Sequence, residues 1–159
     1  MMPLGLSLAA IIVVLDQFTK ALVLAFLEPY QAVEWTSFLS CVLVFNTGVS
    51  FGLFAGETAL LRWILIGLAV AVSVWLMSWL YKETRPPVVS SLGLILGGAL
   101  GNVVDRVSRH AVVDFVDLHI GEWHWPAFNL ADSAITVGVM LYLYTSLRDQ
   151  RRRSKLRQK

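Results

Sequence analysis

Polar and ionisable side chains recur at one depth within the apolar segments of this chain of 159 residues. If each segment is a helix rising about 1.5 Å per residue, Asp16 lies about 20 Å from the beginning of its segment and Asn102 about 22 Å from the beginning of another. Asp132 lies about 24 Å from the basic end of a third. An ionisable group inside a bilayer costs about 2.5–3.5 kcal/mol even on a lenient scale, so this shared depth predicts a functional site.

Asp132 is the carboxylate whose partner has to come from another segment. It lies in Phe128-Asn129-Leu130-Ala131-Asp132-Ser133, with no basic residue one helical turn away. Asp114 is a second carboxylate, which its apolar neighbours draw toward the membrane, and Asp105 and Asp117 are alternatives. Two carboxylates at a partly dry boundary do not easily ionise together, so one can activate water while the other stays protonated and polarises a carbonyl. This pattern favours peptidase chemistry, with a transporter's proton relay as the next interpretation.

Two further pairs of polar residues have the spacing of neighbours on one helical face. Asp16 and Lys20 are four residues apart, which is the spacing of an ion pair, and we expect them to have a structural or orienting role. Asn102 and Arg106 share a face in the same way. The sequence leaves open whether Arg106 anchors the end of its helix or belongs to the site.

The elements that position these residues are predicted to be membrane-spanning helices. Hydrophobic residues make up 57% of the chain and charged residues only 15%, and crossing a hydrocarbon core takes about 20 apolar residues. We expect one membrane-embedded domain over residues 1–159, an all-α membrane protein with a small extracytoplasmic β cradle. The third span places Gly93, Gly97 and Gly101 four residues apart, a face that lets another helix approach closely. The expected spans are residues 3–26, 59–80, 87–104 and 128–147.

Basic residues predict how the spans are oriented. Lys82 and Arg85 follow the second span, and seven Lys and Arg residues lie in the tail, residues 148–159. By the positive-inside rule these positions are cytoplasmic, so both termini lie inside and residues 27–58 and 105–127 face outward. The basic tail is better explained by attraction to anionic lipid than by binding to nucleic acid.

The first outward segment has the composition of a small β element. Residues 33–54 are rich in aromatic and β-branched residues, and Asn46-Thr47-Gly48 is typical of a turn. Trp35, Trp123 and Trp125 suit the membrane interface, where an amphipathic ring is stable. We therefore expect this element to lie on the outer membrane surface.

Five short motifs follow one another from the first predicted helix to the last. They are Asp16-Gln17 with Lys20, Asn46-Thr47-Gly48 with Phe51-Gly52, Gly97-Gly98-Ala99-Leu100-Gly101-Asn102 with Asp105-Arg106, Val112-Val113-Asp114-Phe115, and Phe128-Asn129-Leu130-Ala131-Asp132-Ser133. With these motifs in this order, the chain resembles the bacterial lipoprotein signal peptidases, also called signal peptidase II.

The resemblance implies an aspartyl endopeptidase of the bacterial inner membrane whose active site lies near the outer face. Its catalytic dyad would be Asp114 and Asp132. The implied substrate is a prolipoprotein that carries a diacylglyceryl group on a cysteine, and cleavage just before that cysteine releases the signal peptide. The family is inhibited by globomycin, and we expect a monomer without a cofactor. The residues implied to bind substrate or support the site are Asn46, Gly48, Asn102, Arg106, Asn129, Asp16 and Lys20.

Other functions fit the sequence less well. A metal-dependent protease could use His110, His119 and His124, but an HExxH motif is absent and we expect no metal. The GxGD motif of presenilin-like proteases is also absent. A transporter could relay protons through Asp16 and Asp132, but such proteins commonly have internal repeats and none is found here.

Overall fold

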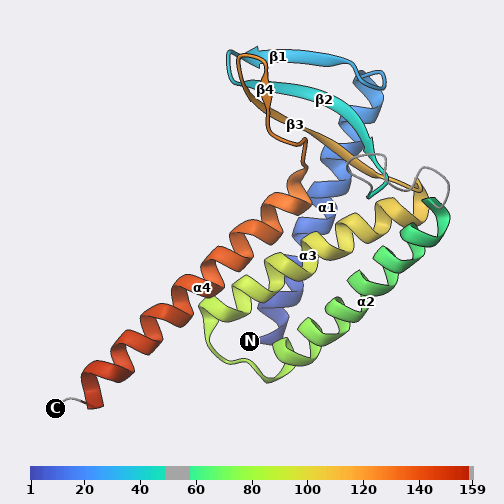
Figure 1. The fold of residues 1–159 in the computed structure, drawn as a ribbon. Helices are drawn as coiled ribbons and strands as arrows, with labels where there is room; N and C mark the ends of the chain where they lie inside the picture. The colour runs from blue at the N-terminus through green and yellow to red at the C-terminus, as the bar shows by residue number, and fades with distance from the viewer. Residues whose placement is uncertain (49–57, 158–159) are drawn as a thin grey trace.

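Four long helices and a small antiparallel sheet make up the computed structural model, which describes residues 1–48 and 58–157 (Figure 1). Each helix in this described part is long and apolar enough to cross a membrane. This confirms the predicted fold class. The helices are α1 (Met2–Phe26), α2 (Thr58–Lys82), α3 (Pro86–Ser108) and α4 (Leu130–Arg157).

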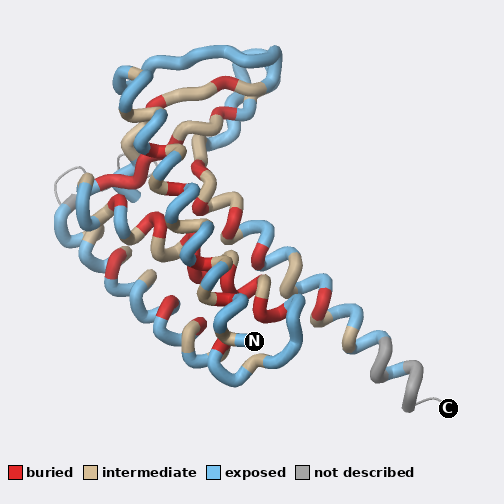
Figure 2. The backbone as a smooth tube through the Cα atoms, turned by 180° about the vertical axis from the view of Figure 1, so that it is seen from behind, coloured by how far each residue is buried: buried red, intermediate tan, exposed pale blue. Residues whose placement is uncertain are grey.

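Helix α3 lies at the centre of the bundle and packs against the other three helices. It is also the most buried of them, as the red segments of Figure 2 show. A Cβ atom added to Gly93 would lie 2.6 Å from the carbonyl oxygen of Gly5, and one added to Gly97 would lie 2.7 Å from that of Ala9. The predicted close approach of a neighbouring helix is confirmed, and the neighbour is α1.

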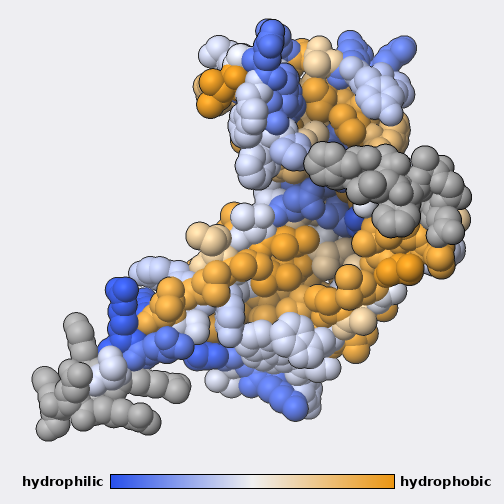
Figure 3. Space-filling model, in the orientation of Figure 1, coloured by the Kyte–Doolittle hydropathy of each residue, from blue (hydrophilic) through white to orange (hydrophobic). Residues whose placement is uncertain are grey.

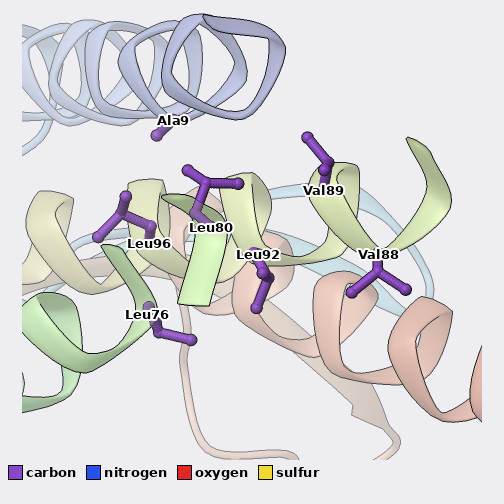
Figure 4. Close-up of a cluster of buried hydrophobic side chains, with 7 residues drawn as sticks. All are labelled: Ala9, Leu76, Leu80, Val88, Val89, Leu92 and Leu96. Atoms are coloured by element: carbon purple, nitrogen blue, oxygen red, sulfur yellow. The ribbon is translucent and has the colours of Figure 1, made fainter. Parts of the chain in front are cut away.

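An apolar core fills the half of the bundle next to the α2–α3 turn (Figure 4). It joins the first half of α1, the last turns of α2 and the first half of α3, so that these helices meet through side chains that need no hydrogen-bond partner. Its buried residues are Ala9, Leu76, Leu80, Val88, Val89, Leu92 and Leu96.

The sheet lies at the other end of the bundle, away from both chain termini (Figure 1). Its strands pair in the order β1 (Ala32–Thr36), β2 (Leu39–Asn46), β3 (Val112–Ile120) and β4 (Trp123–His124), and all pairs are antiparallel. The β element predicted from residue 33 onward is confirmed as far as Asn46, and residues 49–54 lie outside the described part. The second outward segment also forms strands, which the sequence analysis did not predict.

Helices α3 and α4 have boundaries that differ from the predicted spans. The third helix continues past residue 104 to Ser108, so Asp105 and Arg106 are helical. The fourth helix begins at Leu130 rather than residue 128, because Asn129 occupies the N-cap position. It then continues to Arg157, and most of the predicted basic tail is therefore part of the same helix.

Candidate active site

The first turn of α4 is closed by two side chains that cap each other. The side-chain oxygen of Asn129 accepts a hydrogen bond from the Asp132 backbone N–H (3.0 Å), and Asp132 Oδ2 accepts one from the Asn129 backbone N–H (3.3 Å). This reciprocal arrangement is a capping box with Asn and Asp at its two positions. The sequence signal, an Asn followed three residues later by an Asp, is visible in the chain but was not used. The cap fixes the position of the Asp132 carboxylate.

Asp16 provides a third acceptor for the same helix end. Its Oδ1 accepts a hydrogen bond from the Ala131 backbone N–H at 3.0 Å, and its side chain is fully buried. The N-terminus of a helix carries unpaired N–H groups and a partial positive charge, both of which favour a carboxylate. Asp16 therefore ties the middle of α1 to the beginning of α4, at the shared depth that the sequence predicted.

Side-chain amides connect Asp132 to Asp114 on β3. The Asn102 amide donates to Asp132 Oδ1 at 2.8 Å, and the Asn129 amide donates to Asp114 Oδ1 at 2.7 Å. Asn129 also donates to the Asn102 side-chain oxygen at 3.3 Å, which links the two amides. Asn46 completes the set by donating to Asp114 Oδ2 at 2.9 Å. Two carboxylates from distant parts of the chain are thus bridged by N–H donors.

Gly48 fixes the orientation of the Asn46 side chain. The Gly48 backbone N–H donates to Asn46 Oδ1 at 2.8 Å, so the amide nitrogen of Asn46 is the end that faces Asp114. Gly48 has φ +88°, a left-handed backbone conformation that residues other than glycine rarely adopt. The turn predicted at these residues therefore has a direct consequence for the carboxylate pair.

Burial changes the acidity of Asp114, which is only 2% exposed. Loss of solvent around the carboxylate raises the pKa of Asp114 from 3.8 to about 6. The hydrogen bonds from Asn46 and Asn129 oppose this rise, and the nearby charge of Asp132 adds to it. The pKa of Asp114 therefore lies close enough to neutral pH for this group to carry a proton during a reaction.

The carboxylate pair is accessible from the surface on the Asp132 side. Asp132 is partly exposed and lines a groove of about 470 Å³ with Thr136 and Val137 on α4 and aromatic residues below the sheet. Figure 3 shows a hydrophilic zone between the sheet and the helices, bordered by the apolar surfaces of the bundle. A substrate in this position can contact polar groups while it remains against apolar helix surface.

Behind the carboxylate pair lies a buried cation, Lys20. Its ammonium group contacts Asp16 Oδ2 at 2.8 Å and Asp105 Oδ2 at 2.7 Å, and it donates to Asn102 Oδ1 at 3.1 Å. The predicted ion pair between Asp16 and Lys20 is confirmed. Gln17 and Arg109 extend this network by contacting Asp105. The sequence analysis quoted Gln17 in a motif but gave neither residue a role, although Arg109 has the four-residue spacing of an ion pair with Asp105.

The two alternatives to Asp114 have other partners. Asp105 is fully buried between Lys20 and Arg109. Asp117 contacts His124 Nδ1 at 2.9 Å, on the part of the sheet away from Asp132. Of the three candidates, Asp114 is the one that is linked to Asn102, because the Asn129 amide donates to both residues.

Arg106 lies at the edge of the site with donors to spare. Its Nη1 is 3.4 Å from the Asn102 carbonyl oxygen, and its buried Nε has no hydrogen-bond partner among the described residues. The guanidinium is also close enough to Asp132 and Asp114 to interact with their charges. This position agrees better with a site residue than with a simple anchor at the helix end.

Histidines do not form a metal site in the described ranges, 1–48 and 58–157. No three His, Cys, Asp or Glu side chains there gather closely enough to hold an ion. His119 instead bonds to Ser40 at 3.0 Å and His124 to Asp117, and the two rings stack with centroids 5.1 Å apart. These contacts correspond to ordinary interfacial hydrogen bonding.

Comparison with known proteins identifies the family. The model of the family described as Signal peptidase (SPase) II matches residues 8–148. The chain belongs to the signal peptidase II family. This peptidase is 50% identical over 138 residues to a lipoprotein signal peptidase of Methylobacterium sp. (strain 4-46), covering 86% of this chain and 84% of the relative. It is 46% identical over 144 residues to one of Azoarcus sp. (strain BH72), covering 90% and 82%.

A solved structure confirms the fold of the peptidase. A bacterial membrane enzyme determined by the in meso method at 1.9 Å resolution superposes with a TM-score of 0.82 and 28% sequence identity. The match covers 92% of this chain and 94% of that chain. The resemblance stated from the motifs is thus confirmed, and the protein is a multi-pass membrane peptidase.

Proposed function

We propose that this lipoprotein signal peptidase cleaves diacylglyceryl-modified prolipoproteins just before the lipidated cysteine, with Asp114 and Asp132 as catalytic residues. The observation that carries this proposal is the pair of carboxylates bridged by the amides of Asn102 and Asn129. Such a pair can share one proton between its members, which is the requirement of aspartyl proteolysis. No step of this reaction requires a metal or a cofactor.

In the proposed reaction, the two carboxylates have opposite roles. Asp132 lies at the N-terminus of α4, where two N–H donors hold its carboxylate, and it takes a proton from water. The water oxygen then bonds to the scissile carbonyl carbon, while protonated Asp114 donates its hydrogen to the carbonyl oxygen. As the C–N bond breaks, the proton held by Asp132 passes to the nitrogen of the lipidated cysteine, and Asp114 takes back its proton from a hydroxyl of the intermediate. The signal peptide leaves with a new carboxyl group.

The remaining site residues bind substrate or support the pair. Arg106 can donate to a substrate carbonyl through its guanidinium N–H groups. Asn46 and Gly48 hold one side of Asp114, and the amides of Asn102 and Asn129 hold both carboxylates. Asp16 and Lys20 support the site from behind, through Ala131 and Asn102 respectively.

The membrane arrangement is part of the proposal. Residues 1–159 act as one domain and as a monomer in the bacterial inner membrane, with both termini cytoplasmic. The exposed rings of Trp35, Trp123 and Trp125 all belong to the sheet end of the protein, which suits an interfacial position at the outer face. A diacylated cysteine keeps its acyl chains in the bilayer and its peptide bond near this surface, so the substrate reaches the carboxylate pair at the correct depth.

A reconstituted cleavage assay tests this function. Purified protein in lipid is given one prolipoprotein in two forms, with and without the diacylglyceryl group, and release of the signal peptide is followed on a gel. We expect cleavage of the modified form alone, its inhibition by globomycin, and its loss in Asp132→Asn but not in the matched control Asp117→Asn. Cleavage of both forms would contradict the proposed specificity, and failure of folded wild-type protein to cleave either would contradict the function.

A further inference from the structure

The ammonium group of Lys20 has one neutral partner among its three acceptors. Two acceptors are the carboxylates of Asp16 and Asp105, and the third is the side-chain oxygen of Asn102 at 3.1 Å. An ammonium group has three donors and no acceptor, so these contacts satisfy it completely. Lys20 is also fully buried, and water cannot replace any of the three partners.

Lys20 and the Asn129 amide, which also donates to Asn102 Oδ1 at 3.3 Å, together determine which end of the Asn102 amide faces the carboxylate pair. An asparagine side chain offers an oxygen at one end and an NH₂ group at the other. With Lys20 in place, only the oxygen can face the ammonium, because the reverse orientation would place an NH₂ group against a cation. The NH₂ group of Asn102 is therefore directed at Asp132, to which it donates at 2.8 Å.

We infer that Lys20 is a positioning residue for the peptidase reaction, which sets the orientation of the Asn102 amide so that Asp132 receives an N–H donor. This inference rests on the proposed function, since it assumes that Asp132 is the base. It assigns to Lys20 a role in catalysis beyond neutralising the buried carboxylates around it. The effect passes from Lys20 on α1, through Asn102 on α3, to Asp132 on α4.

Reversal of the amide would destabilise the carboxylate of Asp132. The Asn102 oxygen would then face Asp132 Oδ1, and the carboxylate would lose a donor and gain a repulsive neighbour. The charged groups that also act on this position are Asp16 on α1, Asp105 and Arg106 on α3, and Asp114 on β3. Asp105 is replaced in both variants compared below, so its charge does not distinguish them.

The experiment has to separate positioning from simple charge compensation. Lys20→Met alone would leave the buried Asp16 without a cation and Asp105 with Arg109 alone, and could unfold the protein. We therefore compare Lys20→Met/Asp105→Asn with Asp105→Asn, which retains the contacts of Lys20 with Asp16 and Asn102. For both variants, kcat, KM and the melting temperature are measured on the folded protein in lipid, with the diacylglyceryl-modified prolipoprotein as substrate.

We expect the double variant to have a kcat at least about tenfold lower than Asp105→Asn, with KM changed less than about twofold. Equal kcat values, with a difference in melting temperature alone, would overturn the inference. Asp132→Asn is assayed in parallel. If it cleaves the substrate, the proposed dyad itself fails. If it is inactive while the two other variants have equal kcat values, only the role of Lys20 fails.

Discussion

Next to the α2–α3 turn, the helices pack through apolar side chains and glycines, whereas beneath the sheet α1, α3 and α4 are joined by hydrogen bonds and ion pairs. The first region buries residues such as Leu92 that need no polar partner. The second buries Asp16, Lys20 and Asn129 completely, and each has partners in another segment.

The difference shows which part of the molecule depends on residue identity. Apolar packing tolerates exchange between side chains of similar volume at a cost usually below about 1.5 kcal/mol. A buried polar network does not, because removing one member leaves others without partners in a region of low dielectric constant. We therefore expect substitutions in the apolar region to change stability alone, and substitutions in the polar region to change both stability and cleavage.

The largest expected effect is that of Lys20→Met on its own. It leaves the buried Asp16 without its cation and Asp105 with Arg109 alone, and breaking such a buried pair typically destabilises a protein by about 3–5 kcal/mol. Thermal unfolding of the purified protein in detergent measures this loss, with the exposed Lys82→Met as the matched control. A melting temperature equal to that of the control would contradict the comparison between the two regions.

Leu92→Ala in the apolar core should lower stability without changing the chemistry. Leu92 is 1% exposed, and truncating such a side chain usually costs about 2–5 kcal/mol. Unfolding and kcat are measured on the same sample, with Leu68→Ala on the exposed face of α2 as the control. A fall in kcat per folded molecule comparable to that of a polar-region variant would show that the two regions are not separable.

Asn46→Ala should shift the pH profile of cleavage. The pKa of Asp114 is about 6, so kcat/KM of the wild type should fall as pH rises through about 6 and Asp114 loses its proton. Asn46 donates to the ionised form, and its removal raises the pKa of Asp114 further and moves this fall to higher pH, by about half a unit. The neighbouring Thr47→Ala serves as the control. An unmoved profile would remove Asp114 as the titrating group.

The smallest expected effect lies outside both regions, in the α2–α3 turn. Glu83 contacts Arg85 at 2.9 Å, and this hydrogen-bonded pair lowers the pKa of Glu83 from 4.5 to about 2. Its stabilisation should thus be complete above pH 4.5 and be lost as pH falls toward 2. Because Arg85 is largely exposed, we expect Glu83→Gln to cost only about 0.2–1 kcal/mol near neutral pH, with unchanged cleavage. Chemical denaturation at pH 7 and pH 3 measures the free energy of unfolding, with Glu28→Gln as control. A larger loss of stability on Glu83→Gln at pH 3 than at pH 7 would contradict this prediction.

The apolar region could be predicted from the sequence because its signals are local. Each span is an uninterrupted apolar run of sufficient length, and the spacing of Gly93, Gly97 and Gly101 lies within one helix. The ion pair between Asp16 and Lys20 was predicted for the same reason, since its two members are one turn apart.

Much of the polar region could not be predicted in this way, because its contacts join residues that are distant in the chain. The contact of Lys20 with Asp105 depends on how α1 packs against α3, and β3 is a strand because it pairs with β2. The choice of Asp114 over Asp105 and Asp117 rested on family resemblance rather than on physical reasoning. The catalytic roles of Asp114 and Asp132 remain predictions.

The central claim is that the bridged carboxylates perform the cleavage, and a paired binding and single-turnover experiment tests it most directly. Each variant, Asp114→Asn or Asp132→Asn, is placed in lipid bilayers in excess over the diacylglyceryl-modified prolipoprotein. Bound and cleaved substrate are then quantified separately. We predict that both variants bind the intact substrate as the wild type does and cleave it at least about a thousandfold more slowly. Cleavage by either variant within about tenfold of the wild-type rate would contradict the assignment of that residue.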